Sequence, residues 1–152
     1  MELNTASSVI SHISKMERES AGFYEEFSEA YSELKEVFLS FAEENKKNER
    51  TVKRAYYSVV SDALETNFSF KGLRSDFTMP VSGKLSSAHE VLDASIEMEK
   101  GIEEFYRRAA GLSKALLADV PRAMERVAKH RVARVERLRE IRRALGTEDR
   151  SR

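Results

Sequence analysis

Apolar positions recur at intervals of three and four residues along the first part of the chain. They fall at Val9, Ile10, Ile13, Met16, Phe23, Tyr24, Phe27, Tyr31 and Leu34, with the small residue Ser20 in the same series. This spacing keeps side chains on one face of an α-helix. Residues 5–8, Thr-Ala-Ser-Ser, offer helix caps at its start. The pattern predicts an amphipathic helix over about residues 6–31.

The same periodicity resumes after a short break and predicts a second helix over about residues 34–64. Its buried side should carry Phe38, Phe41, Thr51, Val52, Ala55, Tyr56, Val59 and Ala63. The break is too short for the chain to cross a bundle, so we expect the first two helices to pack antiparallel.

The helical period is lost after residue 64, and the chain becomes rich in turn-forming residues. We expect a crossover over about residues 65–87. Three phenylalanines occur in it, so it should pack on the rest of the protein rather than form a free linker: Phe68, Phe70 and Phe77.

Two more helices are predicted in the second half of the chain. The third should run over about residues 88–112 and be capped by Ser86 or Ser87. The fourth should run over about residues 121–145, with Pro121 in its first turn and Gly146 as its C-cap. Residues 147–152 should form a frayed tail.

These elements predict an all-α fold of two antiparallel helical hairpins joined by a long crossover. That connectivity is the ferritin-like version of the four-helix bundle. The composition agrees, because six glycines, two prolines and long stretches rich in Ala, Leu, Glu, Lys and Arg disfavour a sheet protein. We expect residues 1–152 to form a single ferritin-like domain.

Charge and cysteine content limit the kinds of function. The 26 basic and 26 acidic residues cancel, so we expect neither nucleic acid nor a membrane as a partner. The chain has no cysteine, which excludes disulfides, thiolate catalysis and cysteine-ligated metal sites. It also lacks an apolar run long enough for a membrane span and a signal-peptide pattern at its start. We therefore expect a cytoplasmic protein.

A short motif occurs twice, as MERESAGFY at residues 16–24 and as MEKGIEEFY at residues 98–106. Seven residues are nearly two helical turns, so Glu17 lies on the same face as Tyr24, and Glu99 on the same face as Tyr106. Helical glutamates are usually solvated. Here both glutamates continue the apolar stripe of their helix, where a charge needs a partner or a metal.

At these residues the chain resembles the rubrerythrin-like branch of the ferritin-like di-iron carboxylate proteins. In that family, helices one and three carry Glu followed by Phe-Tyr, and helices two and four carry Glu-x-x-His. The resemblance covers about residues 8–143. It implies a metal centre concerned with iron or peroxide, an iron- or manganese-dependent oxidoreductase activity, and Tyr24 and Tyr106 packed beside the metal. We also expect a homodimer.

Helices two and four depart from the family pattern. Aligned on it, Glu44 and Lys47 occupy the Glu-x-x-His positions of helix two, and Val127 and His130 those of helix four. By the family roles, the hypothesis is one Fe, Mn or Zn ion bound by Glu44, Glu99 and His130, with Glu17 as a further candidate ligand. Lys47, which cannot ligate while protonated, would pair with Glu17 instead.

Two functions remain open from the sequence. The first is a metal-binding, rubrerythrin-like protein with a mononuclear or vestigial site. With no cysteine for a rubredoxin-like electron-entry domain, it would need an electron-donor partner protein if it is redox-active. The second is a metal-free ferritin-like bundle that serves as a structural or interaction module. His12 and His89 have no partner at ligand spacing and are predicted to be surface or cap residues.

Overall fold

The computed structural model describes residue 3 and residues 6–62, 73–75, 77–112 and 119–150. These residues form four long helices and two short 3-10 helices, and they contain no β-strand. The long helices are α1 (Ala6–Ala30), α2 (Lys35–Asp62), α3 (Ala88–Leu112) and α4 (Asp119–Arg150). The 3-10 helices are η1 (Ser32–Leu34) and η2 (Ser82–Lys84). The prediction of an all-α chain is confirmed.

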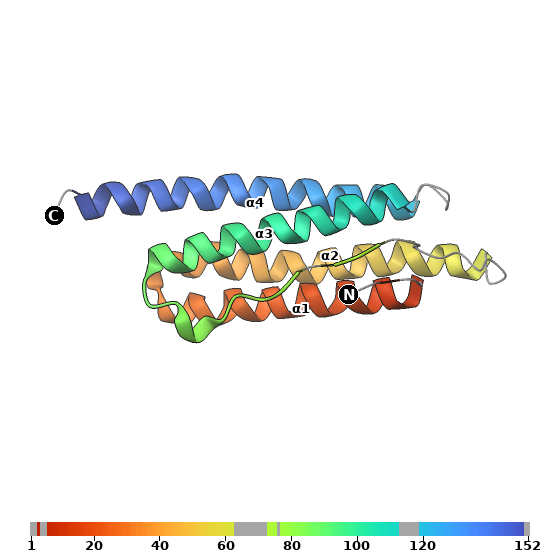
Figure 1. Ribbon diagram of the computed structural model, residues 1–152, viewed down its shortest axis with the longest axis horizontal. Helices are drawn as coiled ribbons and strands as arrows, with labels where there is room; N and C mark the ends of the chain where they lie inside the picture. Colours follow the sequence, from red (N-terminus) through yellow and green to blue (C-terminus); the bar gives the residue numbers. More distant parts are fainter. Residues whose placement is uncertain (1–2, 4–5, 63–72, 76, 113–118, 151–152) are drawn as a thin grey trace.

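The four long helices pack as two antiparallel hairpins (Figure 1). The short η1 joins α1 to α2, and α3 runs antiparallel to α4 in the second hairpin. The hairpins meet mainly where α2 lies beside α4. α2 ends at the opposite end of the bundle from the start of α3, so the connection between them runs back along the helices. The described helices are compatible with the predicted connectivity, and residues 65–72 and 76 of the predicted crossover lie outside the described residues.

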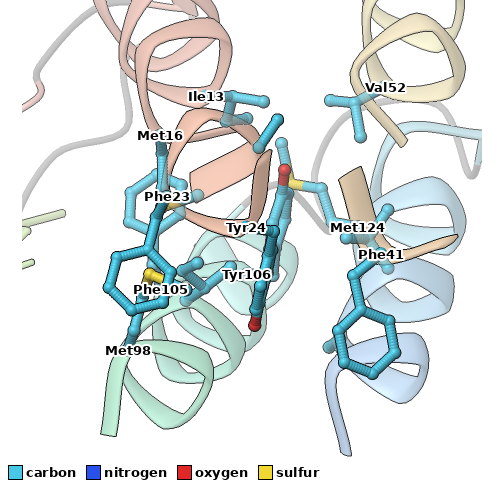
Figure 2. Close-up of a cluster of buried hydrophobic side chains, with 14 of the residues drawn as sticks. Ile13, Met16, Phe23, Tyr24, Phe41, Val52, Met98, Phe105, Tyr106 and Met124 are labelled. Carbon is cyan, nitrogen blue, oxygen red and sulfur yellow. The ribbon is translucent and has the colours of Figure 1, made fainter. Parts of the chain in front are cut away.

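The core lies between the hairpins and follows the predicted stripes (Figure 2). Every predicted position of the first stripe is buried except Tyr31, which is half-buried. In α2, three of the predicted positions are buried, namely Phe38, Phe41 and Val52, whereas Thr51, Ala55 and Tyr56 are half-buried. The side chain of Val59, together with Ala63, Phe68 and Phe70, lies outside the described residues. The periodicity therefore identified the buried faces of the first hairpin.

Ser87 caps the start of α3. Its Oγ accepts a hydrogen bond of 3.1 Å from the backbone N–H of Glu90. The Glu90 carboxylate accepts in return from the backbone N–H of Ser86 at 2.8 Å and from the Ser86 hydroxyl at 3.0 Å. This reciprocal arrangement is a capping box, which satisfies N–H groups that have no partner inside the helix. The sequence prediction of a cap at Ser86 or Ser87 is thereby confirmed and assigned to Ser87.

We predict that Ser87→Ala lowers the free energy of unfolding by about 1 kcal/mol, because it removes the acceptor for the Glu90 N–H. Urea denaturation followed by circular dichroism measures the change. Ser40→Ala is a suitable control, because Ser40 is an exposed serine inside α2. An equal loss in both variants would contradict the role of Ser87 as a cap.

The end of α4 differs from the prediction. The helix continues through Gly146 to Arg150, so Gly146 is not its C-cap and the predicted frayed tail is helical up to residue 150. A glycine inside a helix costs only about 1 kcal/mol relative to alanine and does not by itself end the helix. Leu145, just before this glycine, is half-buried and packs against the core. Pro121 lies in the first turn of α4, as predicted.

No helix in the described part of the chain is both long and apolar enough to cross a membrane.

Candidate functional site

The two glutamates of the repeated motif lie at the centre of the bundle. Glu17 on α1 is 1% exposed and Glu99 on α3 is 0% exposed. Each continues the apolar stripe of its helix, as the repeat predicted. Removing two carboxylates from water costs several kcal/mol for each ion unless cations and hydrogen-bond donors surround them. The other residues of the centre supply both.

The tyrosines of the two motifs bind each other's glutamates. The Tyr24 hydroxyl donates to Glu99 Oε1 at 2.5 Å. The Tyr106 hydroxyl donates to Glu17 Oε1 at 2.6 Å. Both tyrosines are fully buried. The repeated sequence therefore builds a reciprocal arrangement, in which each copy of the motif supplies the donor for the carboxylate of the other.

Arg131 on α4 lies between the two glutamates. Its Nη1 donates to Glu99 Oε1 at 2.8 Å and to Glu99 Oε2 at 2.9 Å. Its Nη2 donates to Glu17 Oε2. Arg131 is 0% exposed, the largest side chain among those that are fully buried. One guanidinium group thus joins α1, α3 and α4 in the middle of the protein.

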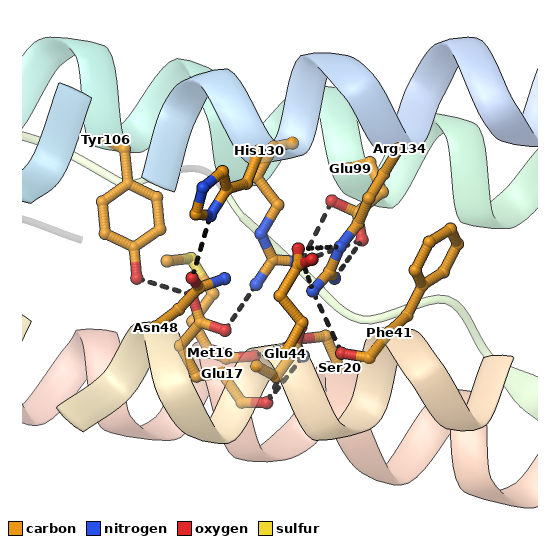
Figure 3. Close-up of polar contacts among 12 residues, drawn as sticks. Met16, Glu17, Ser20, Phe41, Glu44, Asn48, Glu99, Tyr106, His130 and Arg134 are labelled. Atoms are coloured by element: carbon orange, nitrogen blue, oxygen red, sulfur yellow. Dashed lines mark hydrogen bonds and ion pairs between the residues drawn. The ribbon is translucent and has the colours of Figure 1, made fainter. Parts of the chain in front are cut away.

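Arg134, one turn further along α4, extends the network to α2 (Figure 3). Its Nη1 donates to Glu99 Oε1 at 3.1 Å and its Nε to Glu44 Oε1 at 3.0 Å. Its Nη2 donates to the backbone carbonyl of Phe41 at 3.0 Å, and the guanidinium carbon lies 4.8 Å from the centre of the Phe41 ring. Arg134 is 2% exposed. The two buried arginines balance the charges of the two buried glutamates.

Two buried asparagines on α2 face the same centre. Asn45 donates from Nδ2 to the backbone carbonyl of Glu17 at 3.0 Å and to Ser20 Oγ at 2.7 Å. The Oδ1 of Asn48 lies 3.3 Å from Nδ1 of His130. Asn45 is 1% exposed and Asn48 is 3% exposed. These amides tie α2 to α1 and to α4 without adding charge.

The environment of the network determines the charge of its members. Burial alone would raise the pKa of Glu99, but the positive charges of Arg131 and Arg134 outweigh burial and hold this pKa below its ordinary value. Burial and the neighbouring carboxylates raise the pKa of Tyr24 and of Tyr106 well above the ordinary value for tyrosine. Burial opposes the charge on Arg131, but Glu17 and Glu99 more than compensate and raise its pKa. At neutral pH the tyrosines are therefore neutral donors, and Glu99 and Arg131 are charged.

The residues predicted as metal ligands are distributed differently. Glu99 is central, and Glu44 reaches the network through Arg134 with its side chain 39% exposed. His130 is exposed on α4 and contacts Asn48. Within the part of the chain that the structure describes, no group of three or more histidine, aspartate or glutamate side chains is placed to hold a metal ion.

The predicted ion pair between Glu17 and Lys47 is replaced by another pair. Glu17 pairs with Arg131, and Lys47 is exposed on α2. The physical reason is the direction of the side chains, since Lys47 lies on the outer face of α2 and Asn48 on the inner face. The buried Glu17 carboxylate therefore pairs with Arg131, whose guanidinium group lies at the same level of the bundle.

The sequence-based hypothesis missed the arginines and asparagines because it was aligned on His130. The buried stripe of α4 runs through Met124, Val127, Arg131, Arg134 and Leu138, which leaves His130 outside. The buried stripe of α2 runs through Phe38, Phe41, Asn45, Asn48 and Val52, which leaves Glu44 and Lys47 outside. Following these intervals of three and four residues, rather than the one histidine, would have found all four polar residues.

The inward pairs Asn45/Asn48 and Arg131/Arg134 have the three-residue spacing of the Glu-x-x-His motif. Their chemistry does not fit a metal centre. A guanidinium group has no lone pair to donate and stays protonated in proteins, and the carboxamides are weaker ligands than carboxylate and imidazole. Glu17 and Glu99, which could bind a cation, already bind the cationic group of Arg131.

We predict that Tyr24→Phe lowers the free energy of unfolding by about 1.5–3 kcal/mol at pH 7, because it removes a hydrogen bond to a charged group. The high pKa of Tyr24 also affects how stability depends on pH in alkaline solution. The unfolded chain loses tyrosine protons near pH 10 whereas the folded protein keeps them, so stability should fall as the pH rises above about 10.

Urea denaturation between pH 7 and pH 11 measures both effects. The loss of stability in base should be smaller in Tyr24→Phe than in the parent protein. Tyr57→Phe is the matched control, because Tyr57 is 58% exposed. Equal pH profiles for the two variants would contradict the burial of a neutral Tyr24 hydroxyl against Glu99.

The buried network consists of two carboxylates, two guanidinium groups and two phenol hydroxyls at the meeting point of the hairpins. These six groups come from α1, α3 and α4, and Arg134 links them to Glu44 and to the backbone of Phe41 on α2. Comparison of the chain with models of protein families, with curated proteins and with solved structures finds no match.

Proposed function

We propose that the chain is a ferritin-like four-helix bundle in which two arginines stand where related bundles hold metal ions, and that it serves as a structural or interaction module. The observation that carries this proposal is the position of Arg131. Its guanidinium group is fully buried and bonded to both Glu17 and Glu99. A divalent ion between these carboxylates would have to displace a cation that is already bonded to each of them.

The spacing of the inward residues supports the ferritin-like part of the proposal. In the di-metal bundles, two helices each give one Glu and the other two each give Glu-x-x-His. Here α1 and α3 each give one Glu, while α2 gives Asn45 and Asn48 and α4 gives Arg131 and Arg134 at the same three-residue spacing. Compared with that pattern, the four inward positions of α2 and α4 carry no carboxylate or imidazole and supply two positive charges.

The contacts of the network support a structural role. Arg131 and Arg134 on α4 bind Glu17 of α1 and Glu44 of α2, so the second hairpin holds the first by ion pairs at fixed positions. Buried polar groups can fix the register in which helices pack, even where apolar residues would give equal stability. A bundle held in one register presents a constant outer surface to a partner.

Metal content tests the proposal. Purified protein is treated with a chelator, dialysed separately against Fe(II) without oxygen, Mn(II) and Zn(II), and then analysed for bound metal. We expect no stoichiometric binding of any of the three ions, and no peroxide consumption beyond that of free iron. One or more metal ions per chain, lost on substitution Glu99→Gln, would contradict the proposal and favour the metalloprotein.

A second variant tests the assignment of the four inward positions. The combined substitution Asn45→Glu, Asn48→His, Arg131→Glu and Arg134→His restores Glu-x-x-His on α2 and α4. We expect this variant to bind metal and to gain helical circular dichroism when metal is added. A variant with only Lys47→His, which creates the same motif with Glu44, is the control and should bind none. Metal binding by the control alone would show that Glu44 and residue 47, rather than residues 45 and 48, face the centre.

A further inference from the structure

A cavity of about 540 Å³ lies away from the buried network, between α1 and the segment that precedes α3. Its walls come from α1, at His12, Lys15, Met16 and Glu19, and from the segment at Ser75, Phe77, Thr78 and Met79. This volume lies within the range of small-molecule sites, about 300–1,000 Å³. The cavity is large enough for a small organic molecule.

The apolar part of the cavity is formed by Met16, Phe77 and Met79. Phe77 lies over Gly101 of α3, where a Cβ added to the glycine would stand 3.6 Å from the ring. The Phe77 ring thus lies close to the backbone of α3 at Gly101. Methionine side chains are flexible and polarisable and adapt to apolar ligands of different shape. This part of the cavity therefore suits an apolar group of moderate size.

The polar part carries one charge of each sign. Lys15 and Glu19 are both exposed, and neither forms an ion pair with another described residue. They are four residues apart on α1, so their Cβ atoms are about 5–6 Å apart on the same face. A molecule that carries an ammonium group and a carboxylate close together can meet both charges at once.

His12 adds an uncharged polar group to the same wall. The sequence predicted a surface or cap residue, but His12 is half-buried, and its ring lies 4.9 Å from that of Phe105. Its Nε2 is buried without a hydrogen-bond partner among the described residues. Ser75 and Thr78 supply hydroxyl groups on the opposite wall. The lining of the cavity thus contains hydrogen-bonding groups in addition to the two charges.

We propose that this cavity binds an apolar α-amino acid or a zwitterion of the same form. The ligand carboxylate pairs with Lys15, its ammonium group pairs with Glu19, and its side chain packs on Met16, Phe77 and Met79. An apolar acid without the ammonium group would leave Glu19 unpaired beside the ligand carboxylate. An amine without the carboxylate would leave Lys15 unpaired beside the ammonium group of the ligand. The arrangement of charges thus selects for the zwitterion.

The test compares three ligands of similar shape: L-phenylalanine, 3-phenylpropionate and phenethylamine. Binding is followed by amide chemical shifts of the ¹⁵N-labelled full chain. We expect saturable shifts in α1 and in residues 73–81 with phenylalanine. Each analogue, which lacks one charged group, should bind at least about fivefold more weakly. The metal-binding experiment is independent, so failure of one proposal leaves the other intact.

Two variants assign the charges. Lys15→Gln should abolish the preference for phenylalanine over phenethylamine, and Glu19→Gln should abolish the preference over 3-phenylpropionate. Lys100→Gln on α3 is the control, because Lys100 does not line the cavity, and it should leave all three affinities unchanged. The proposal is overturned if phenylalanine gives no saturable shifts at about 10 mM, above the usual affinity of a small-molecule site. It is also overturned if an analogue binds the parent protein as tightly as phenylalanine.

Discussion

Substitution of Arg131 by methionine should lower the free energy of unfolding by about 3–5 kcal/mol, the largest effect expected for one residue of the network. The reason is that the substitution leaves the carboxylates of Glu17 and Glu99 buried without the positive charge of Arg131. Glu17 and Glu99 are 1% and 0% exposed, and Arg131 donates to both. Methionine fills much of the space, but it leaves two carboxylates buried with less positive charge. Urea denaturation at pH 7 measures the loss.

Two further variants test whether the loss of stability comes from uncompensated buried charge. Arg137→Met changes the same residue type on the same helix, but the Arg137 side chain is 58% exposed, and the effect should stay within about 0.5 kcal/mol. The triple variant with Arg131→Met, Glu17→Gln and Glu99→Gln removes both buried carboxylates together with Arg131, leaves Arg134 paired with Glu44, and should recover part of the lost stability. If the triple variant were no more stable than Arg131→Met alone, loss of packing rather than uncompensated charge would explain the effect.

Glu99→Gln should cost about 3 kcal/mol at pH 7, because Glu99 accepts hydrogen bonds from Tyr24, Arg131 and Arg134 together. The cost should depend on pH. The pKa of Glu99 is held below its ordinary value in the folded protein, so the unfolded chain takes up this proton first as the pH falls. Stability from the charged Glu99 is present above about pH 4.3, the ordinary value for glutamate, and is lost below it.

The measurement is the difference in unfolding free energy between the parent protein and Glu99→Gln from pH 7 down to pH 3. The difference should shrink as the pH falls, since the parent protein loses the charge that the variant never had. Glu97→Gln, an exposed change two residues away on α3, should show little difference at any pH. A constant difference for Glu99→Gln across this range would contradict a charged Glu99 between the arginines.

The ion pairs lie at fixed positions along the helices, which a purely apolar core would not provide. Apolar side chains of the same volume could give the core equal or greater stability. They would not fix how far α4 slides along α1 and α2. Glu17, Glu44 and Phe41 each receive a hydrogen bond from one particular nitrogen of Arg131 or Arg134. A shift of one turn would break all three, which is the basis of our proposal that the network sets the register of the hairpins.

The fold could be predicted because the relevant signals are local. Periods of three and four residues identified α1 and α2, and Ser87 and Pro121 marked the starts of α3 and α4. The predicted end of α4 was wrong because a single glycine is a weak stop signal, and α4 continues beyond it to Arg150. Helix ends depend on contacts with other elements, which the local sequence does not show.

The site could be predicted only in part. The repeat correctly placed Glu17, Glu99, Tyr24 and Tyr106 in the centre, because the carboxylates lie within apolar stripes. It could not show that each tyrosine binds the glutamate of the other motif, since that depends on how the hairpins pack. Arg131 and Arg134 were missed because arginine is rarely buried. In addition, the alignment placed His130, the residue before Arg131, at the inward position. Side-chain direction, rather than residue type, decides which positions face the centre.

The central claim is that the guanidinium group of Arg131, and not a metal ion, lies between Glu17 and Glu99. A crystal structure grown with Fe(II), Mn(II) or Zn(II), with anomalous data collected at the absorption edge of that metal, tests it most directly. We predict no anomalous peak at the centre of the bundle and density for Arg131 in contact with both carboxylates. An anomalous peak within metal-ligand distance of Glu17 or Glu99, about 2.0–2.2 Å, with Arg131 displaced, would contradict the claim.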